Sequence, residues 1–340
     1  MSKKVLLIYT GGTIGMAKDI VSGALVPINF DELSRAIPEL KLLPCEIHSI
    51  SFKEPIDSSD MNPEHWLELA RMIHSNYDLY DGFVVLHGSD TMAYTASALS
   101  FLLENVGKPV ILTGSQLPVG ILRTDARENL ISSLELAVAS DENGAPFITE
   151  VAVYFEYKLY RGNRTFKNSS ENFEAFQSPN YPVLAEMGVE MKINFGALLP
   201  KPTAPFYLHQ VLENNIAVIP LYPGFNENII LKTVEAGTKG LILRTFGAGN
   251  GPSNSGFTAA LRSVIAAGVP VINVSQCRFG TVNQAKYAAG RHLQEVGVIS
   301  GIDITLEAAI TKLMFLLGQK LNAIQISQSF SKSLRGEINE

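Results

Sequence analysis

Residues 5–15 read VLLIYTGGTIG, a short apolar run that ends in a pair of glycines. An apolar run of this length, bounded by turn residues, is typical of a buried strand. The arrangement returns at 82–92 in GFVVLHGSDTM and at 110–118 in VILTGSQLP, and longer helical patterns separate the runs. Strands that alternate with helices predict βαβ units and a parallel sheet.

The apolar runs fall into two series, which predict two parallel sheets. Expected strands of the first series are Val5–Tyr9, Phe83–His87, Val110–Thr113 and Val151–Phe155, and those of the second are Ala217–Leu221, Gly240–Arg244 and Val269–Val274. Helical periodicity is clear at Met92–Glu104, Glu128–Ala139, Phe257–Ala267 and Leu306–Leu317. The predicted fold class is α/β, with two domains that each hold a mainly parallel sheet flanked by helices.

The chain length and the prolines predict where the domains divide. At roughly 150 residues per domain, the 340 residues suggest two domains. Pro200, Pro202 and Pro205 block regular structure between the two strand series. We expect an N-terminal domain at 1–190, a linker at 191–212 and a smaller C-terminal domain at 213–340.

The composition argues against several classes of protein. The chain has 27 Lys and Arg against 33 Asp and Glu, a net charge of −6, whereas nucleic-acid binders usually carry a basic balance or stripe. Two cysteines cannot build a disulfide framework, and no Cys/His run has the spacing of zinc ligands. No apolar stretch approaches the roughly 18 residues that suggest a membrane helix. We therefore expect a cytoplasmic protein that uses no metal or organic cofactor and binds neither nucleic acid nor membrane.

Thr13 directly follows Gly11 and Gly12 at the end of the first strand. The glycines permit a tight turn that exposes backbone N–H groups beside the threonine hydroxyl. The spacing fits neither the G-x-G-x-x-G dinucleotide fingerprint nor a phosphate-binding P-loop. From the motif alone, a reactive Thr13 and a strand-to-helix turn capped by Thr13 are both open interpretations.

Ser89 and Asp90 follow the strand that closes at His87. An aspartate where a helix begins is usually an N-cap or first-turn residue. A histidine that closes a buried strand is more often a hydrogen-bonded core residue than a general base, which needs a reachable proton and a supporting partner. Taken alone, HGSDTM favours a structural role.

Two further polar segments are ambiguous by themselves. In DSSD, at Asp57–Asp60, adjacent hydroxyls and backbone amides near a helix start suit a carboxylate ligand, but a polar loop with a helix cap fits equally well. The segment Tyr160–Lys167 reads YRGNRTFK, and lysines are common in surface loops.

The combination of these segments is more specific than any one of them. In an open parallel sheet, the carboxyl ends of the strands form the ligand crevice, and the polar residues converge there. Together they resemble the bacterial-type L-asparaginase family, in particular its cytosolic type I enzymes. The resemblance extends from about Lys4 to Ile338 and is carried by TGGTIGM, DSSDM, HGSDTMAYTASALSFLLENVGKPVILTGSQLP, LYRGNRTFK, ILRTFGAGN, SQCRFG and SLRGEI.

The resemblance implies an activity and four catalytic residues. The activity is hydrolysis of L-asparagine to L-aspartate and ammonia through an ester on a threonine. Thr13 matches the nucleophile, and Ser89 matches a second catalytic hydroxyl that is usually a threonine in the family. Asp90 matches the aspartate that holds the substrate amino group, and Lys167 matches the lysine that this aspartate contacts.

The resemblance also implies a substrate site and an assembly. The α-carboxylate site matches Ser58, Ser59 and the backbone around Asp57, and the N–H groups of Gly12 and Ser89 suit the oxyanion of a tetrahedral intermediate. Asn250 matches a residue that reaches the active site of a neighbouring subunit. The family is typically a tetramer, built as a dimer of intimate dimers.

A second asparagine site is known in type I enzymes, and residues of this chain match it. They are Arg244 and the consecutive Ser275, Gln276 and Cys277. The chain departs from the pattern at Phe166, where a small hydroxyl residue would suit that site. An allosteric response to asparagine is therefore an expectation of the resemblance.

Two departures concern catalysis itself. Ser89 lacks the β-methyl group that restricts χ1 of threonine, so its hydroxyl is less tightly aimed. Where many relatives place a lid tyrosine that closes on Thr13, this chain offers Ala24 and Leu25. Two alternatives stay open beside an asparaginase: the amidase subunit of a tRNA amidotransferase, and a catalytically weak asparagine-sensing relative.

Overall fold

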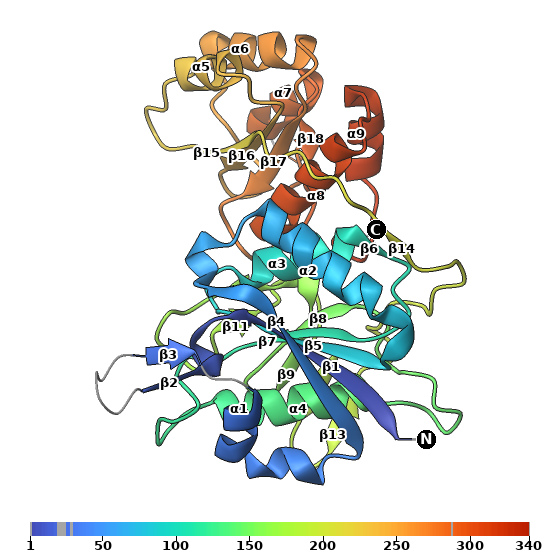
Figure 1. The fold of residues 1–340 in the computed structure, drawn as a ribbon. Coiled ribbons are helices and arrows are strands. Elements are labelled where there is room, and N and C mark those ends of the chain that lie inside the picture. The colour runs from blue at the N-terminus through green and yellow to red at the C-terminus, as the bar shows by residue number, and fades with distance from the viewer. Residues whose placement is uncertain (1, 19–24, 28–29, 287, 340) are drawn as a thin grey trace. The chain divides into compact units, whose positions relative to one another are not determined.

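The computed structural model describes residues 2–18, 25–27, 30–286 and 288–339, and it divides into two compact units between His209 and Gln210. Each unit is built on a mainly parallel sheet with helices beside it (Figure 1). The predicted α/β fold is thus confirmed.

The first unit contains an eight-stranded sheet in the order β13-β12-β9-β8-β7-β5-β1-β4. Its parallel strands are β1 (Lys3–Gly11), β4 (Cys45–Ile56), β5 (Gly82–Leu86), β7 (Val110–Thr113) and β8 (Val151–Phe155). An antiparallel edge, which the sequence did not predict, adds β9 (Lys158–Arg161), β12 (Ala185–Met187) and β13 (Met191–Ile193). The carboxyl ends of β4, β1, β5 and β7 therefore lie along one edge of the sheet.

Helices cover both faces of this sheet, with α2 (Pro63–Ser75) and α3 (Met92–Leu102) on one face and α1 (Phe30–Ala36) and α4 (Ala126–Val138) on the other (Figure 1). Both faces of the central strands are consequently buried. Val5 and Leu7 pack in one core cluster with Leu130 and Leu134 of α4, and the alternate residue Leu6 is fully buried as well. Burial on both sides explains why these strands are continuous apolar runs.

Short elements connect the main ones in the first unit. They are η1 (Thr13–Gly15), β2 (Met16–Lys18), β3 (Leu25–Pro27), η2 (Pro38–Leu42), η3 (Ser58–Asp60), η4 (Tyr77–Leu79), β6 (Leu103–Glu104), η5 (Gly162–Arg164), β10 (Phe166–Lys167), β11 (Phe176–Gln177) and β14 (Tyr207–Leu208). The helix predicted at Met92–Glu104 ends two residues early because β6 pairs with β14. The predicted linker 191–212 contains β13 and β14, which are paired strands of the first unit, β13 with β12 and β14 with β6.

The second unit contains four parallel strands in the order β15-β16-β17-β18. The strands are β15 (Ile216–Pro220), β16 (Gly240–Thr245), β17 (Val271–Ser275) and β18 (Ile299–Ser300). The helices are α5 (Asn228–Glu235), α6 (Ser255–Ala266), α7 (Ala288–Glu295), α8 (Leu306–Gly318) and α9 (Ala323–Phe330). Leu241, Leu243 and Val271 of the sheet form one core cluster with Leu261 and Val264 of α6.

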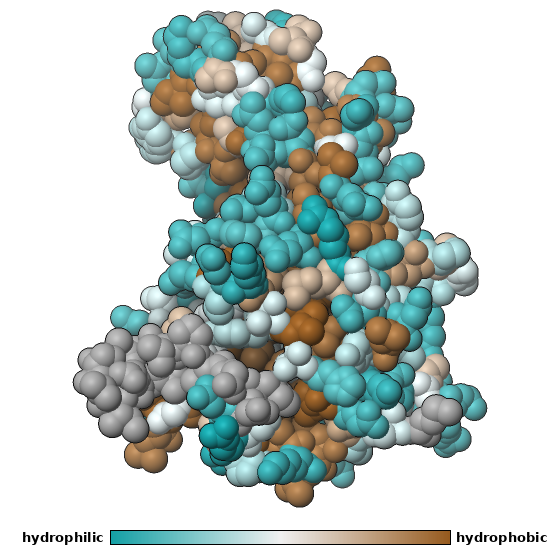
Figure 2. Space-filling model, viewed as in Figure 1, coloured by the Kyte–Doolittle hydropathy of each residue, from teal (hydrophilic) through white to brown (hydrophobic). Residues whose placement is uncertain are grey.

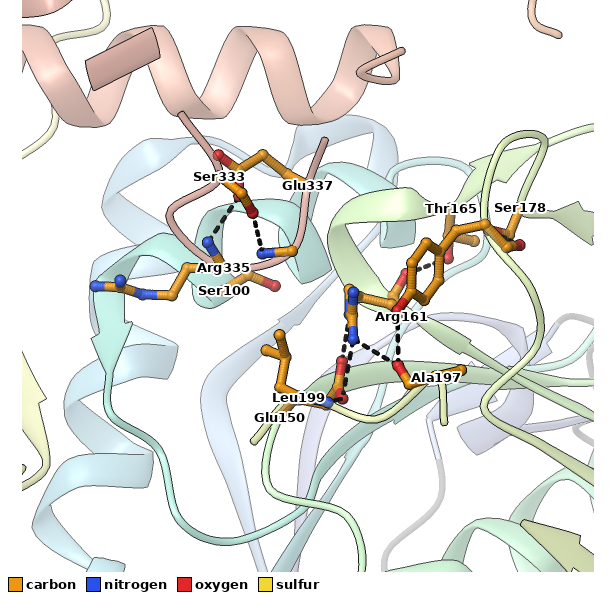
Figure 3. Close-up of polar contacts among 12 residues, drawn as sticks. Ser100, Glu150, Arg161, Thr165, Ser178, Ala197, Leu199, Ser333, Arg335 and Glu337 are labelled. Atoms are coloured by element: carbon orange, nitrogen blue, oxygen red, sulfur yellow. Dashed lines mark hydrogen bonds and ion pairs between the residues drawn. The ribbon is translucent and has the colours of Figure 1, made fainter. Parts of the chain in front are cut away.

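A buried ion pair fastens the C-terminal SLRGEI motif to α8. Lys312 Nζ lies 2.5 Å from Glu337 Oε1, and both side chains are fully buried. Glu337 also accepts hydrogen bonds from the backbone N–H groups of Leu334 and Arg335, and Ser333 accepts one from Gly336 (Figure 3). Removing either charge would leave the other one buried and unpaired, which typically costs about 3–5 kcal/mol.

The surface is mixed in character. On the face shown in Figure 2, hydrophilic residues cover much of the surface, and apolar residues reach it in separate patches. Among the described residues, no helix is both long enough and apolar enough to cross a membrane.

Candidate active site

Thr13 lies on a glycine turn that packs directly against the end of the neighbouring strand. Gly11 and Gly12 have φ of 132° and 88°, a region that side chains other than glycine rarely adopt. A Cβ atom on Gly12 would lie 2.4 Å from the backbone nitrogen of Gly88. Thr13 begins a single 3₁₀ turn whose N-cap position is Gly12, and no side chain caps it. The interpretation of Thr13 as a helix cap is therefore wrong.

Tyr9 stabilises this turn through its hydroxyl group. Its hydroxyl donates to the carbonyl oxygens of Gly15 at 3.2 Å and Gly12 at 3.4 Å. Burial raises the pKa of Tyr9 to about 12, so the hydroxyl stays protonated and acts as a donor at neutral pH. The predicted lid position Ala24 lies outside the described residues, and Leu25 is the first residue of β3.

Ser89, Asp90 and Lys167 form one hydrogen-bonded set. Lys167 Nζ donates to Ser89 Oγ at 2.8 Å and to Asp90 Oδ1 at 2.6 Å. The lysine side chain is 17% exposed, whereas that of Asp90 is 64% exposed. The N-cap of α3 is Thr91, which makes no side-chain cap bond. The N-cap interpretation of Asp90 is wrong because its carboxylate pairs with Lys167.

Gln116, which no sequence motif singled out as a site residue, joins this set. Because Lys167 donates to Ser89 Oγ, the serine hydroxyl can donate onward to Gln116 Oε1 at 3.4 Å. The Gln116 loop is held by Asp125, which accepts the backbone N–H groups of Gln116 and Leu117. The polar segment TGSQLP follows a predicted strand and could have suggested Gln116 as a site residue. Only the fold, however, shows that residue 116 lies beside residue 89.

A second buried ion pair stabilises the segment that leads to Lys167. Arg161 Nε donates to Glu150 Oε2 at 2.6 Å, and both side chains are 3% exposed. Arg161 also donates to the carbonyl oxygen of Ala197, and its own carbonyl accepts the hydroxyl of Thr165, two residues before Lys167 (Figure 3). The basic YRGNRTFK segment is therefore largely buried rather than a loose surface loop.

The DSSD segment lies at the end of β4, beside the glycine loops. Asp57 Oδ1 accepts hydrogen bonds from the backbone N–H and the hydroxyl of Ser59, both at 2.9 Å, and these bonds lower the pKa of Asp57. Ser58 is 4% exposed, and a Cβ atom on Gly88 would lie 2.5 Å from its Oγ. The cap interpretation of Asp57 is confirmed, and Ser58 lies against the same loop as Gly12.

The remaining predicted site residues belong to the second unit. Arg244 donates to the carbonyl oxygen of Gln276 at 3.3 Å, and Ser275 Oγ accepts the backbone N–H of Cys277 at 3.0 Å. Among the described residues, Arg244 Nε and Asn250 Oδ1 are buried without a hydrogen-bond partner. In the described part of the chain, no group of three or more His, Cys, Asp or Glu could hold a metal ion.

Comparison with known proteins assigns the chain to a family. A model of the asparaginase N-terminal domain matches residues 4–198, and a model of the glutaminase/asparaginase C-terminal domain matches residues 215–330. The chain belongs to the asparaginase family. Of the asparaginases compared, L-asparaginase 1 of Escherichia coli K12 is 42% identical over 99% of this chain and 98% of its own length.

Solved structures of asparaginases share the whole fold. L-asparaginase I of Vibrio cholerae is 40% identical, with a TM-score of 0.90 and 100% of both chains covered. A probable cytoplasmic L-asparaginase of Campylobacter jejuni is 26% identical, with a TM-score of 0.80 over 97% of this chain and 100% of its own. The resemblance inferred from the motifs is confirmed.

Proposed function

We propose that this protein hydrolyses the side-chain amide of L-asparagine to give L-aspartate and ammonia. The observation that carries the proposal is the hydrogen-bonded set of Ser89, Asp90 and Lys167 beside the Thr13 turn, in a chain 42% identical to an L-asparaginase over nearly its whole length. A hydroxyl nucleophile needs a proton path and donors for the oxyanion, and these residues offer both.

The proposed reaction has two steps. Thr13 Oγ1 attacks the amide carbon, its proton passes to the leaving nitrogen, the C–N bond breaks, and ammonia leaves a β-aspartyl ester on Thr13. Water then attacks the ester carbon, the bond to Thr13 breaks, and aspartate and the free hydroxyl result. Ser89 activates this water, and Lys167, hydrogen-bonded to Ser89 Oγ at 2.8 Å, carries the proton.

The other atoms near the turn suit an amino-acid substrate. Asp90, whose side chain is 64% exposed, would bind the substrate ammonium through its carboxylate. Ser58 and Ser59 would bind the α-carboxylate. Among the described residues, no backbone partner accepts the N–H group of Gly12 or of Ser89. These two donors are thus available to the oxyanion.

The test is ammonia release from asparagine and glutamine, measured side by side. We expect release from asparagine at a rate that is linear in enzyme concentration, together with stoichiometric aspartate. Asparagine that binds by calorimetry without release of ammonia would favour the sensing alternative. The amidotransferase alternative is more distant, because the glutamyl-tRNA(Gln) amidotransferase polypeptide from Pyrococcus horikoshii is 33% identical and this chain covers 76% of it.

We also propose a homotetramer built from dimers, in which Asn250 reaches the active site of a neighbouring copy. A buried acceptor without a partner typically costs about 1–3 kcal/mol, and Asn250 Oδ1 is such an acceptor among the described residues. A substrate held between two copies would satisfy it once the Asn250 side chain turns outward. Sedimentation velocity should give four copies per particle, and a monomer with full activity would contradict this assembly.

We further propose a second asparagine site in the second unit. Arg244, with Ser275, Gln276 and Cys277, would bind the carboxylate of a second asparagine, because Arg244 Nε is buried without a partner among the described residues. We propose a cytoplasmic location, in line with the Campylobacter neighbour.

A further inference from the structure

A continuous chain of buried hydrogen bonds runs behind the loop that carries Ser89. Trp66 of α2 donates from Nε1 to Thr95 Oγ1 of α3 at 3.0 Å. Thr95 Oγ1 lies 2.8 Å from His87 Nε2, at the end of β5, and His87 Nδ1 lies 2.6 Å from the carbonyl oxygen of Gly88. Thr95 and His87 are fully buried and Trp66 is 5% exposed, so water does not compete for these bonds.

The two ends of this chain fix the direction of its outer bonds, and a neutral His87 then fixes the direction of the bond between them. An indole N–H can only donate, and a carbonyl oxygen can only accept. His87 Nδ1 must therefore carry the proton that Gly88 accepts. In a neutral imidazole Nε2 is then an acceptor, so the hydroxyl of Thr95 donates to it while accepting from Trp66. Every polar atom of the chain then has a partner, and Thr95 Oγ1 both accepts from Trp66 and donates to His87.

His87 is held in this neutral form by its surroundings. Burial lowers the pKa of His87 to about 4, and the hydrogen bond to Gly88 only partly opposes that effect. The imidazole is thus uncharged at neutral pH and does not face a substrate. On the side of the Ser89 loop, its ring contacts the carbonyl of Gly88.

That carbonyl belongs to the same rigid peptide plane as the N–H of Ser89. Fixing one end of the plane fixes the direction of the other. Gly88 is also closely packed, because a Cβ atom on it would lie 2.5 Å from Ser58 Oγ, and one on Gly12 would lie 2.5 Å from the Gly88 Cα, which is part of this plane. The plane can rotate only by breaking the bond to His87 or by displacing these neighbours.

We propose that Thr95 and His87 are positioning residues that aim the Ser89 N–H at the oxyanion of the tetrahedral intermediate. The inference rests on the proposed amide hydrolysis, in which that N–H is an oxyanion donor. It assigns to the buried histidine a task that requires no proton transfer. His87 holds a carbonyl so that the amide on the other side of the peptide bond points at the developing charge.

The test compares three variants of the full-length protein. His87→Leu removes the donor to Gly88, and His87→Asn replaces it with an amide nitrogen near the position of Nδ1. Thr113→Val is the matched control, because the Thr113 hydroxyl is also buried and donates to a backbone carbonyl, that of Tyr154 at 3.0 Å. Steady-state kinetics with asparagine and thermal unfolding are measured for each variant.

We expect His87→Leu to lower kcat about tenfold while KM changes less than twofold, because deleting an oxyanion donor costs ~10²–10³-fold and misaiming one costs part of that. His87→Asn should recover at least half of the lost rate. Thr113→Val should lower the unfolding temperature and leave kcat unchanged. A folded His87→Leu variant with wild-type kcat, or an Asn variant no faster than Leu, would overturn the proposal.

A second measurement separates this proposal from the proposed function. The ¹⁵N resonances of the His87 imidazole report its tautomer without any turnover. The hydrogen-bond chain from Trp66 to Gly88 predicts that the His87 ring is neutral and protonated at Nδ1 from pH 8 down to about pH 5. If the wild-type protein releases no ammonia, the proposed function fails. A His87 ring protonated at Nε2 would independently refute the positioning role of His87.

Discussion

The carboxyl edges of the two sheets carry polar residues of similar kinds but use them differently. In the first unit the side chains bond to one another, as in the contact of Lys167 with Ser89 and Asp90. In the second unit they hold loop backbone, since the Gln276 amide donates to the carbonyls of Leu221 and Arg244. The first edge thus holds the proposed reaction site, whereas the second edge holds its own loops and contains buried polar atoms without partners among the described residues.

The buried polar atoms without partners make this contrast informative. Arg244 Nε and Asn250 Oδ1 are buried without partners in the described part of the chain, and such groups are usually satisfied in proteins. We infer that variants that remove a polar group at the first edge should impair chemistry, whereas variants at the second should change assembly or cooperativity. The following predictions test that division, beginning with the largest effect.

Thr13→Ala should lower kcat by at least about 10³-fold, because the substitution removes the nucleophile and leaves only binding and the oxyanion donors. Folding should be intact, since the glycines rather than the Thr13 side chain shape the turn. Ammonia release and circular dichroism measure the two quantities. Thr10→Val is the control, because the Thr10 hydroxyl only donates to the carbonyl of Leu86. Ordinary activity in Thr13→Ala would remove the nucleophile assignment.

Lys167→Met should lower kcat by about 10²–10³-fold, within the range of general acid–base catalysis. Methionine keeps an unbranched side chain, one heavy atom shorter than that of lysine, but cannot donate to Ser89 or Asp90. Lys158→Met is a matched control, since Lys158 forms an exposed ion pair with Glu174 at 3.6 Å, away from Ser89 and Asp90 in the sequence. A loss of only a few-fold in Lys167→Met would show that the lysine is peripheral to the proton path.

Arg244→Ala should change the shape of the velocity curve rather than its maximum. If a second asparagine binds there, the wild-type curve is sigmoidal and the variant curve hyperbolic, with kcat within about threefold, because each ligand shifts the subunits toward one state. Arg262→Ala, an exposed position on α6, should keep the sigmoidal curve. Hyperbolic kinetics in the unmodified protein, with one asparagine per subunit by calorimetry, would exclude the second site.

Ser89→Thr should have the smallest effect, a kcat that is level or higher by up to about threefold. The added methyl group narrows χ1 and holds the hydroxyl in fewer rotamers, and the bond from Lys167 Nζ can be kept. Steady-state kinetics and the unfolding temperature are measured together. A large fall in kcat without loss of stability would show that the pocket is shaped around serine.

The sequence predicted the parts of the fold that depend on local patterns. Buried parallel strands are continuous apolar runs, and the turn at Gly11 and Gly12 follows from their tolerance of positive φ. The edge strand β4 was not predicted, because one of its sides is largely exposed and its residues alternate less clearly. Short antiparallel strands such as β12 and β13 depend on partners far along the chain.

The site could be predicted only as far as its motifs reached. Thr13, Ser89, Asp90 and Lys167 came from matching residue by residue, and the structure joins the last three through hydrogen bonds. Gln116 could not be foreseen, because its contact with Ser89 spans 27 residues and depends on the loop that Asp125 holds. In the same way, His87 contacts Thr95 of α3, and Thr95 in turn accepts from Trp66 of α2, which is far away in the sequence.

The identity of the residue that carries the acyl group is the central claim, and one measurement tests it directly. The Lys167→Met variant is mixed with asparagine, quenched in acid within milliseconds to seconds, and digested for mass spectrometry. We expect slow deacylation in this variant to leave a β-aspartyl group on the peptide that contains Thr13, and the double variant Thr13→Ala, Lys167→Met to leave none. An aspartyl group on the peptide that contains Ser89 would contradict the account.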